Sequence, residues 1–207
     1  MARPRSGERR QEILETLARL LEETPGAPIT TAKLAAAVGV SEAALYRHFP
    51  SKTRMFDALF EFIEESLFSR INRIDNEPLS ASAKLGQVLH LWLAFADKNH
   101  GLAHLLQGAV LAGEHGRLQE RLSQLYDRLE THLRLMLREA ALRPGAPPPF
   151  VCAQLLLAAA DGRVAQAVRS RFRSSPLTDW DEQWALLRAA LFLEGDLRVR
   201  TRDANPD

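Results

Sequence analysis

The chain has 207 residues, 46% of them hydrophobic and 26% charged, with a formal net charge of +1. This composition is typical of a soluble globular protein with one or two small domains. Cys152 is the single cysteine, which excludes a disulfide-stabilised extracellular protein and makes a cytoplasmic location the expectation. The basic start of the sequence lacks the apolar core of a signal peptide. Even the longest apolar runs, such as residues 155–160, are too short to span a bilayer, so we expect no membrane association.

The charge is distributed unevenly along the chain. Residues 1–54 hold nine Lys or Arg and six Asp or Glu, a net charge of +3. The remaining residues hold 18 basic and 20 acidic side chains, a net charge of −2. This excess is weak evidence for nucleic-acid binding by itself, but it coincides with the motif that follows the first helix.

The first predicted helix extends from residue 6 to residue 23. Its apolar residues recur at helical spacing on one face: Ile13, Leu14, Leu17, Leu20 and Leu21. Four arginines precede or begin this helix: Arg3, Arg5, Arg9 and Arg10. They form either an arm that reaches along DNA or a solvated basic terminus.

Residues 29–56 are the most informative segment, with two short helices around a tight turn and the start of a third helix. Gly39 lies where the first of these helices must end, because glycine tolerates the left-handed backbone. Ser41 is a good N-cap for the next helix, and Ser51 caps the one that follows. Apolar residues at helical spacing face inward: Leu34, Val38, Leu45 and Phe49. The pattern predicts a DNA-reading helix-turn-helix.

The second short helix presents an outward edge that mixes small, aromatic and cationic groups: Glu42, Ala43, Tyr46 and Arg47. Such an edge suits a helix in the major groove. A helical hairpin in an ordinary α-bundle is the alternative. The combined spacing of the glycine, the cap residue and the aromatic residues favours DNA binding.

The rest of the chain also has helical periodicity, and no alternating run typical of a strand is present. A long helix is predicted from residue 51 to about residue 73. Further helices are predicted to end near residue 99 and to cover residues 101–109, 114–138, 150–172 and 179–192, the last with Asp179 as its N-cap. We expect an all-α fold with a DNA-binding domain at residues 1–54, a helical body at 55–194 and a flexible tail at 195–207.

The helix-turn-helix resembles the amino-terminal signature of TetR-family transcription regulators. The residues that carry the resemblance are Val38, Gly39, Ser41, Leu45, Tyr46, His48, Phe49 and Lys52. Later segments extend it to a branch of the family that acts in nucleoid occlusion; they include HLWLAFADKNHGL, GRLQERLSQLYDRLE and VRSRFRSSPLTDWDEQW. The resemblance implies a TetR-like fold, with a helix-turn-helix head on a helical dimerisation body.

In this resemblance the head binds palindromic DNA through the two short helices and the start of the long one. The implied DNA-binding residues are Thr30, Thr31, Lys33, Ser41, Glu42, Ala43, Tyr46, Arg47, His48, Lys52 and Thr53. Tyr46 and Arg47 approach bases or phosphates, whereas Lys52 and the amides near Ser51 hold the DNA backbone at a helix N-terminus.

TetR-like proteins pair through their last two helices, so the aromatic residues of this region are candidates for a homodimer interface. These residues are Phe172, Trp180 and Trp184. An ordinary core position is the alternative for each. Two heads in one dimer would read half-sites about one turn, ~34–36 Å, apart, with one or more dimers at each DNA site.

The nucleoid-occlusion branch inhibits assembly of the division protein FtsZ, which is therefore an implied partner of a chain located in the cytoplasm at the nucleoid. The implied FtsZ-binding residues are Phe62, Arg70, Leu91, Ala94, Lys98 and Asn99. Phe62 falls off the apolar stripe of its helix, and an apolar groove edged by Arg and Lys would suit an apolar, acidic tail. The alternative is that Phe62 belongs to the core and that Arg70 is a solvated charge.

A ligand-responsive TetR-like repressor is the alternative function, and it requires a cavity with converging polar groups. No catalytic constellation and no glycine-rich phosphate loop is present, so we expect no enzyme and no cofactor. His100 and His104 have the spacing of a helical metal pair. No neighbouring ligand completes a site, and no metal is expected.

Overall fold

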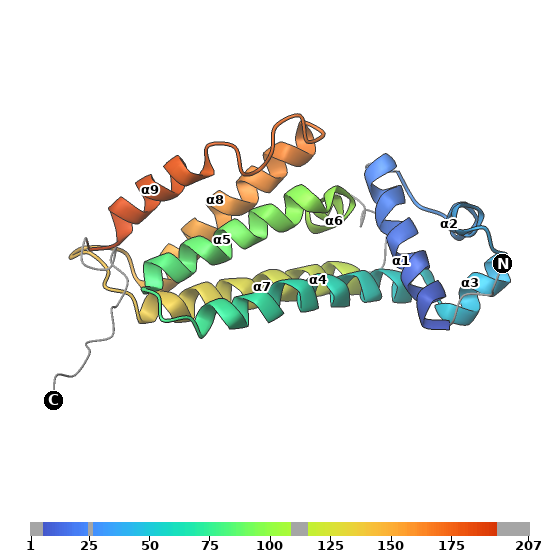
Figure 1. The fold of residues 1–207 in the computed structure, drawn as a ribbon, viewed down its shortest axis with the longest axis horizontal. Helices are drawn as coiled ribbons and strands as arrows, with labels where there is room; N and C mark the ends of the chain where they lie inside the picture. Colours follow the sequence, from blue (N-terminus) through green and yellow to red (C-terminus); the bar gives the residue numbers. More distant parts are fainter. Residues whose placement is uncertain (1–5, 25–26, 109–115, 194–207) are drawn as a thin grey trace. The chain divides into compact units, whose positions relative to one another are not determined.

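The computed structural model describes residues 6–24, 27–108 and 116–193 (Figure 1). Within these ranges it contains nine α-helices and no strand, and one isolated antiparallel bridge joins Leu142 to Phe192. The predicted all-α fold is confirmed for this part of the chain. The predicted tail at residues 195–207 lies outside the described residues.

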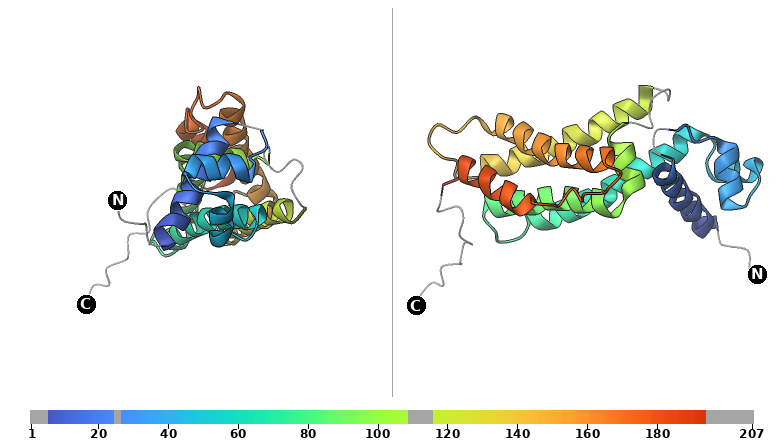
Figure 2. Two further views of the ribbon diagram at one scale, coloured as in Figure 1. Left: turned by 90° about the vertical axis from the view of Figure 1, so that its right-hand side faces the viewer. Right: turned by 90° about the horizontal axis from the view of Figure 1, so that it is seen from above.

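The helices follow the predicted order closely. They are α1 (Ser6–Glu23), α2 (Thr31–Val38), α3 (Glu42–His48), α4 (Lys52–Asp75), α5 (Ala81–Lys98), α6 (His100–Leu106), α7 (Gly116–Arg138), α8 (Pro149–Arg169) and α9 (Trp180–Leu191). The last two run in opposite directions, joined by the loop at residues 170–179 (Figures 1 and 2).

The chain divides into two compact units. The first unit comprises the described residues within 1–66 and 96–125, and the second comprises those within 67–95 and 126–207. The predicted head at residues 1–54 lies wholly in the first unit, which also takes in the start of α4, all of α6 and the first half of α7.

The first unit is organised around α1, which packs against α2, α3 and α6. Its predicted apolar face is buried, with Ile13 and Leu21 fully enclosed. Gly101 of α6 lies directly against the backbone of α1, since a Cβ atom at this position would be 1.9 Å from the carbonyl oxygen of Ala18. Glycine is therefore required for the close approach of these two helices.

Gly101→Ala is expected to destabilise the protein by about 1–3 kcal/mol or more, because the added methyl group can be accommodated only if α1 and α6 move apart. The change is measured as the free energy of unfolding in denaturant. Gly116→Ala is the control, since a Cβ atom at this position meets nothing within 4 Å. Equal stability of the two variants would contradict the close approach.

The second unit contains parts of α4, α5 and α7 together with α8 and α9. The Tyr126 hydroxyl donates to Asp161 Oδ1 at 2.7 Å, and the ring of Trp92 lies edge-on to Tyr126. Trp184 of α9 packs on α5 at Gly86, where a Cβ atom would lie only 2.6 Å from its Nε1 atom.

One prediction about the last two helices needs correction. Asp179 occupies the N-cap position of α9, but its backbone is left-handed (φ 56°) and its side chain makes no capping hydrogen bond. By length and composition alone, α8 is the one helix in the described part of the chain that could cross a membrane.

Candidate nucleic-acid interface

The turn between α2 and α3 is built by local backbone chemistry. The Thr30 hydroxyl accepts a hydrogen bond from the Lys33 amide at 3.1 Å, and the Ser41 hydroxyl accepts one from the Ala44 amide at 3.2 Å. Gly39 ends α2 in the left-handed conformation, with φ 77°. These contacts satisfy helix-end groups that would otherwise lack partners. They confirm the predicted Ser41 cap and the predicted role of Gly39, and they add Thr30 as the cap of α2.

The inward and outward faces of the helix-turn-helix are also as predicted. The inward apolar residues are all buried: Leu34, Val38, Leu45 and Phe49. Because Leu45 and Phe49 fix the rotation of α3, the opposite edge of this helix faces solvent. That exposed edge consists of Glu42, Ala43, Tyr46 and Arg47, and Tyr46 is 42% exposed.

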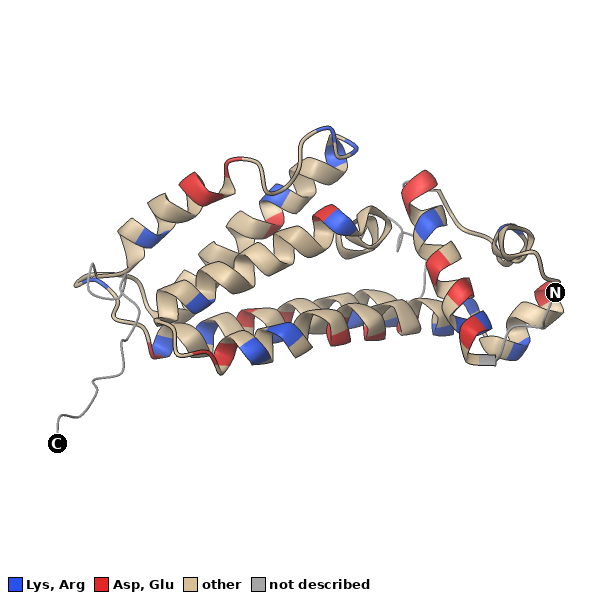
Figure 3. Cartoon of the chain, in the orientation of Figure 1, with Lys and Arg blue, Asp and Glu red and all other residues tan. Residues whose placement is uncertain are grey.

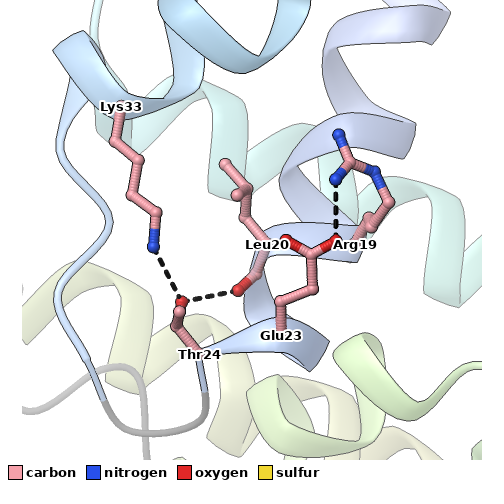
Figure 4. A network of polar contacts seen from close by, with 5 residues as sticks. All are labelled: Arg19, Leu20, Glu23, Thr24 and Lys33. Carbon is pink, nitrogen blue, oxygen red and sulfur yellow. Dashed lines mark hydrogen bonds and ion pairs between the residues drawn. The ribbon is translucent and has the colours of Figure 1, made fainter.

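Three of the predicted DNA-binding residues also hold the head together. The Thr31 hydroxyl donates to Glu42 Oε2 at 2.7 Å and so joins α2 to α3. Lys33 Nζ donates to the Thr24 hydroxyl at 3.3 Å, and Thr24 in turn donates to the Leu20 carbonyl at the end of α1 (Figure 4). These bonds set the position of α2 and α3 relative to α1.

The start of α4 forms the other end of the predicted interface. The Ser51 hydroxyl accepts a hydrogen bond from the Arg54 amide at 3.2 Å and caps the helix, as predicted. Lys52 Nζ lies 5.7 Å from the centroid of the Phe56 ring. Lys52, Thr53 and His48 are all half-exposed. A helix N-terminus that carries a lysine is a favourable site for a phosphate group.

Of the four arginines near the amino terminus, two belong to α1 and not to an extended arm. Arg9 pairs with Glu12 at 2.6 Å, and the Arg10 guanidinium lies 4.8 Å from the centroid of the Phe49 ring. Arg3 and Arg5 lie outside the described residues.

A set of ion pairs between α4 and α7 was missed by the sequence reasoning. Arg117 pairs with the buried carboxylate of Asp57 at 3.2 Å, and Arg121 pairs with Glu64 at 3.1 Å. Asp57, Arg117 and Arg121 also line a hollow of about 320 Å³ in the first unit. Because the partners are about 60 residues apart, no local pattern in the sequence pointed to the pairs.

The predicted partner-binding positions differ in their exposure. Phe62 is 42% exposed, as its place off the apolar stripe of α4 predicted, and Arg70 and Lys98 are also exposed. The other three positions are half-buried: Leu91, Ala94 and Asn99.

The predicted dimer residues have different environments within one chain. Trp180 is only 2% exposed and belongs to the core of the protomer. Trp184 and Phe172 are half-buried, and Trp184 already packs against Gly86 and Phe192. The large exposed apolar side chains of α8 and α9 are instead Phe150, Val151, Leu155 and Leu186.

The two histidines with metal-pair spacing have other environments. His100 lies 3.1 Å from Glu22 of α1, and burial lowers the pKa of His104 below its ordinary value. No group of three or more His, Cys, Asp or Glu in the described part of the chain could hold a metal ion.

The head and the body of the chain match two different family models. Residues 13–59 match the family of bacterial regulatory proteins of the tetR type, and residues 80–192 match the SlmA-like family described as the tetracyclin repressor-like, C-terminal domain. Among solved structures, the MbdR regulator from Azoarcus sp. CIB superposes with a TM-score of 0.75 at 19% identity, over 88% of this chain and 98% of that one. A TetR transcription regulator from Haloarcula marismortui gives a TM-score of 0.73 at 19% identity, over 89% of this chain and 99% of that one. At these identities the superpositions show a shared fold.

Curated relatives are similar over nearly their whole length. The nucleoid occlusion factor SlmA of Shewanella woodyi is 52% identical over 186 residues, which cover 88% of this chain and 94% of that protein. The SlmA of Marinomonas sp. is 49% identical over 192 residues, which cover 91% of this chain and 98% of that protein. The chain therefore belongs to the SlmA nucleoid occlusion factors, within the TetR family of DNA-binding proteins.

Proposed function

We propose that this protein binds palindromic chromosomal DNA as a homodimer and, in that state, inhibits assembly of FtsZ over the nucleoid. The observation that carries the proposal is that the similarity to SlmA proteins, 52% identity over 186 residues, spans the body as well as the head. A head alone is shared by regulators of many kinds. Similarity through the body is what separates a nucleoid occlusion factor from a ligand-responsive repressor.

The DNA-binding part of the proposal is supported by the geometry of residues 30–54. Tyr46 and Arg47 lie on the exposed edge of a short helix of suitable size for the major groove. Lys52 stands at the capped start of α4, where a phosphate is favoured. Residues 1–54 are accordingly proposed as the DNA-binding domain, in a protein that resides in the cytoplasm at the nucleoid.

Dimerisation is supported by the apolar surface of the second unit. Phe150 and Leu155 of α8 are 50% and 49% exposed, and Leu186 of α9 is 73% exposed. Exposed apolar side chains gathered on two neighbouring helices are typical of an interface. Pairing of α8 and α9 with the same helices of a second chain, in a four-helix bundle, would bury these side chains.

The FtsZ-binding part rests on the resemblance of the sequence and on exposure. Phe62 is a large exposed aromatic residue on α4, and Arg70 is an exposed cation eight residues later on the same helix. An aromatic anchor and an arginine are the side-chain types that contribute most binding energy at protein interfaces. An acidic, partly apolar tail of FtsZ would complement both.

A polymerisation assay of FtsZ tests the proposal. Wild-type protein with a palindromic duplex is expected to reduce polymer formation, measured by light scattering, more than protein alone. The double variant Phe62→Ala with Arg70→Asp is expected to lose most of this effect while binding the duplex normally. The matched control is Leu135→Ala with Arg138→Asp, which changes an exposed apolar residue and an exposed arginine on α7.

The assay distinguishes failure of the proposed function from failure of the assigned FtsZ-binding residues. If wild-type protein with specific DNA leaves FtsZ assembly unchanged, the division function fails, and a ligand-responsive TetR-like repressor becomes the better account. If the double variant inhibits as well as wild type does, the function stands and the assignment of Phe62 and Arg70 is wrong.

A further inference from the structure

The loop between α8 and α9 concentrates positive charge. Residues 162–178 contain four arginines and no acidic residue, in a chain whose net charge is only +1. The arginines are Arg163, Arg169, Arg171 and Arg173. Figure 3 shows blue, the colour of Lys and Arg, at the end of α8 and in the loop that follows. Neither the head nor the proposed FtsZ surface uses them.

The backbone of this loop places an arginine where glycine is normally found. The Phe172 amide donates to the Ala167 carbonyl at 2.7 Å and the Arg171 amide donates to the Val168 carbonyl at 3.0 Å, which is the hydrogen-bond pattern of a Schellman helix ending. In that pattern Arg171 occupies the left-handed position, with φ 52°, and Phe172 follows with φ 54°.

Glycine adopts the left-handed backbone without the steric cost that a Cβ atom brings. The folded protein is therefore less stable with arginine at this position than it would be with glycine. Residues held in a costly conformation are concentrated at functional sites. The loop therefore keeps a charged side chain at position 171, where glycine would cost less.

The four arginines divide into one that shapes the loop and three that face its open side. The Arg163 guanidinium donates to the carbonyl oxygens of Pro176 and Thr178 and so ties the loop to α8. Arg173 uses only Nε within the loop, in a bond to the Ser170 carbonyl at 3.1 Å. Arg169 and Arg171 are exposed, and no carboxylate in the described part of the chain pairs with them.

The three available guanidinium groups share one hollow. Arg169, Ser170, Arg171 and Arg173 line an open depression of about 450 Å³ in the second unit. Its ionised side chains all carry the same sign, so the depression favours an anion. Planar guanidinium groups bind phosphate oxygens in pairs, and arginine is preferred over lysine for such contacts.

The loop lacks the means to read bases. Its single aromatic residue, Phe172, is half-buried, so no exposed ring is available for stacking. Arginine contacts to phosphate position nucleic acid and carry no sequence information directly. The regularly spaced phosphates of a nucleic-acid backbone therefore fit this site, and the site does not require a particular base sequence.

We propose that the α8–α9 loop binds the phosphodiester backbone of duplex DNA without sequence preference, as a site additional to the helix-turn-helix. The inference rests on the proposed function in one respect, that the protein acts as a dimer on the chromosome. Each dimer carries two such loops, so a dimer has two of these phosphodiester sites in addition to its two heads.

The decisive variant is Arg171→Gly, which removes the charge and relieves the backbone at the same time. It is expected to unfold at a higher temperature than wild type and to bind a short duplex limited to the palindrome unchanged. On a long duplex without the palindrome, the slope of log affinity against log salt is expected to fall by about 2, since each lost phosphate contact accounts for ~0.9 and a dimer loses two.

Asp179→Gly is the matched control. Asp179 is another residue of the same loop with positive φ (56°), but its replacement removes a negative charge. This variant is expected to keep or increase the salt slope. A slope reduced equally by both glycine variants would show that backbone relaxation, and not charge, is responsible, and would overturn the proposal.

Two further measurements identify the ligand and separate this inference from the function of the head. Two other anionic partners are tested separately: vesicles that contain phosphatidylglycerol, and an acidic peptide in solution. The proposal is overturned if Arg171→Gly weakens binding to either of them but leaves the salt slope on DNA unchanged. The head variant Tyr46→Ala with Lys52→Ala is expected to retain the part of the salt slope that Arg171→Gly removes. If wild-type protein shows no preference for the palindrome, the proposed function is contradicted. The role of the loop is still decided, by comparing the salt slopes of wild type and Arg171→Gly on palindrome-free DNA.

Discussion

The double variant Tyr46→Ala with Lys52→Ala is expected to lose on the order of 100-fold or more in affinity for the palindromic duplex. Loss of a base contact and a phosphate contact costs about 1–3 kcal/mol at each half-site, and both half-sites of a dimer are affected. Tyr46 is exposed on α3, and Lys52 is half-exposed at the start of α4. The affinity is measured by fluorescence anisotropy over a range of salt concentrations.

The single substitutions separate the two kinds of contact. Lys52→Ala is expected to weaken binding to all sequences alike and to reduce the salt slope by about 1 for each protomer, because a phosphate contact carries no sequence information. Tyr46→Ala is expected to reduce the difference in binding affinity between the palindrome and unrelated DNA. Unequal effects of Lys52→Ala on different sequences would assign Lys52 to base reading instead.

Arg19→Ala is the control for the change in charge. Arg19 lies on α1 in the same unit and makes an exposed pair with Glu23 at 2.8 Å (Figure 4). Such exposed pairs contribute little to stability, so the variant should fold normally and bind DNA like wild type. If Arg19→Ala weakens DNA binding as much as Lys52→Ala does, then the loss of affinity in Lys52→Ala comes from the change in net charge and not from a specific contact at α4. A wild-type affinity that does not depend on salt would contradict DNA binding through this surface.

Leu186→Asp is expected to convert the dimer to a monomer, with a dissociation constant raised at least ~100-fold. In a four-helix bundle of α8 and α9 from two chains, the substitution would bury an unpaired carboxylate in each protomer, which costs several kcal/mol. Leu186 is 73% exposed in one chain, so the protomer itself should fold as before. Sedimentation equilibrium measures the association, and circular dichroism measures the fold.

Loss of the dimer is expected to weaken DNA binding as well, because two linked heads bind two half-sites with a high effective concentration. Leu135→Asp is the matched control, since Leu135 is a 48% exposed leucine on α7. A Leu186→Asp protein that remains dimeric at micromolar concentration would rule out this face as the interface. Trp180 is unsuitable for the same test, because it is buried in the protomer and its substitution would report on folding.

The helix-turn-helix could be predicted from the sequence in detail because its signals are local. A glycine, a hydroxyl cap and apolar residues three or four positions apart act within a few residues of the chain. Gly39, Ser41 and Ser51 have the predicted roles, and Leu45 and Phe49 are buried as predicted. The exposure of Phe62 followed in the same way from its place on a helix.

The features that could not be predicted depend on residues far apart in the chain or on backbone angles. Whether Trp180 or Leu186 is available to a second chain depends on which side of α9 packs inward, and both sides carry apolar residues. The pairing of Asp57 with Arg117 requires that α4 and α7 lie side by side. The left-handed conformation of Arg171 contradicts the preference of its residue type. Asp179 belongs to a residue type that tolerates this conformation but does not require it, so residue-type rules predicted neither.

The sequence by itself thus determined the helices, the reading unit and the family, because helical periodicity and end-capping act over one or two turns. The tertiary structure alone decided which apolar residues remain at the surface, which charges pair across helices, and where three arginines gather around one hollow. Burial and long-range pairing are properties of the packed chain, and a residue's neighbours in the sequence do not specify them.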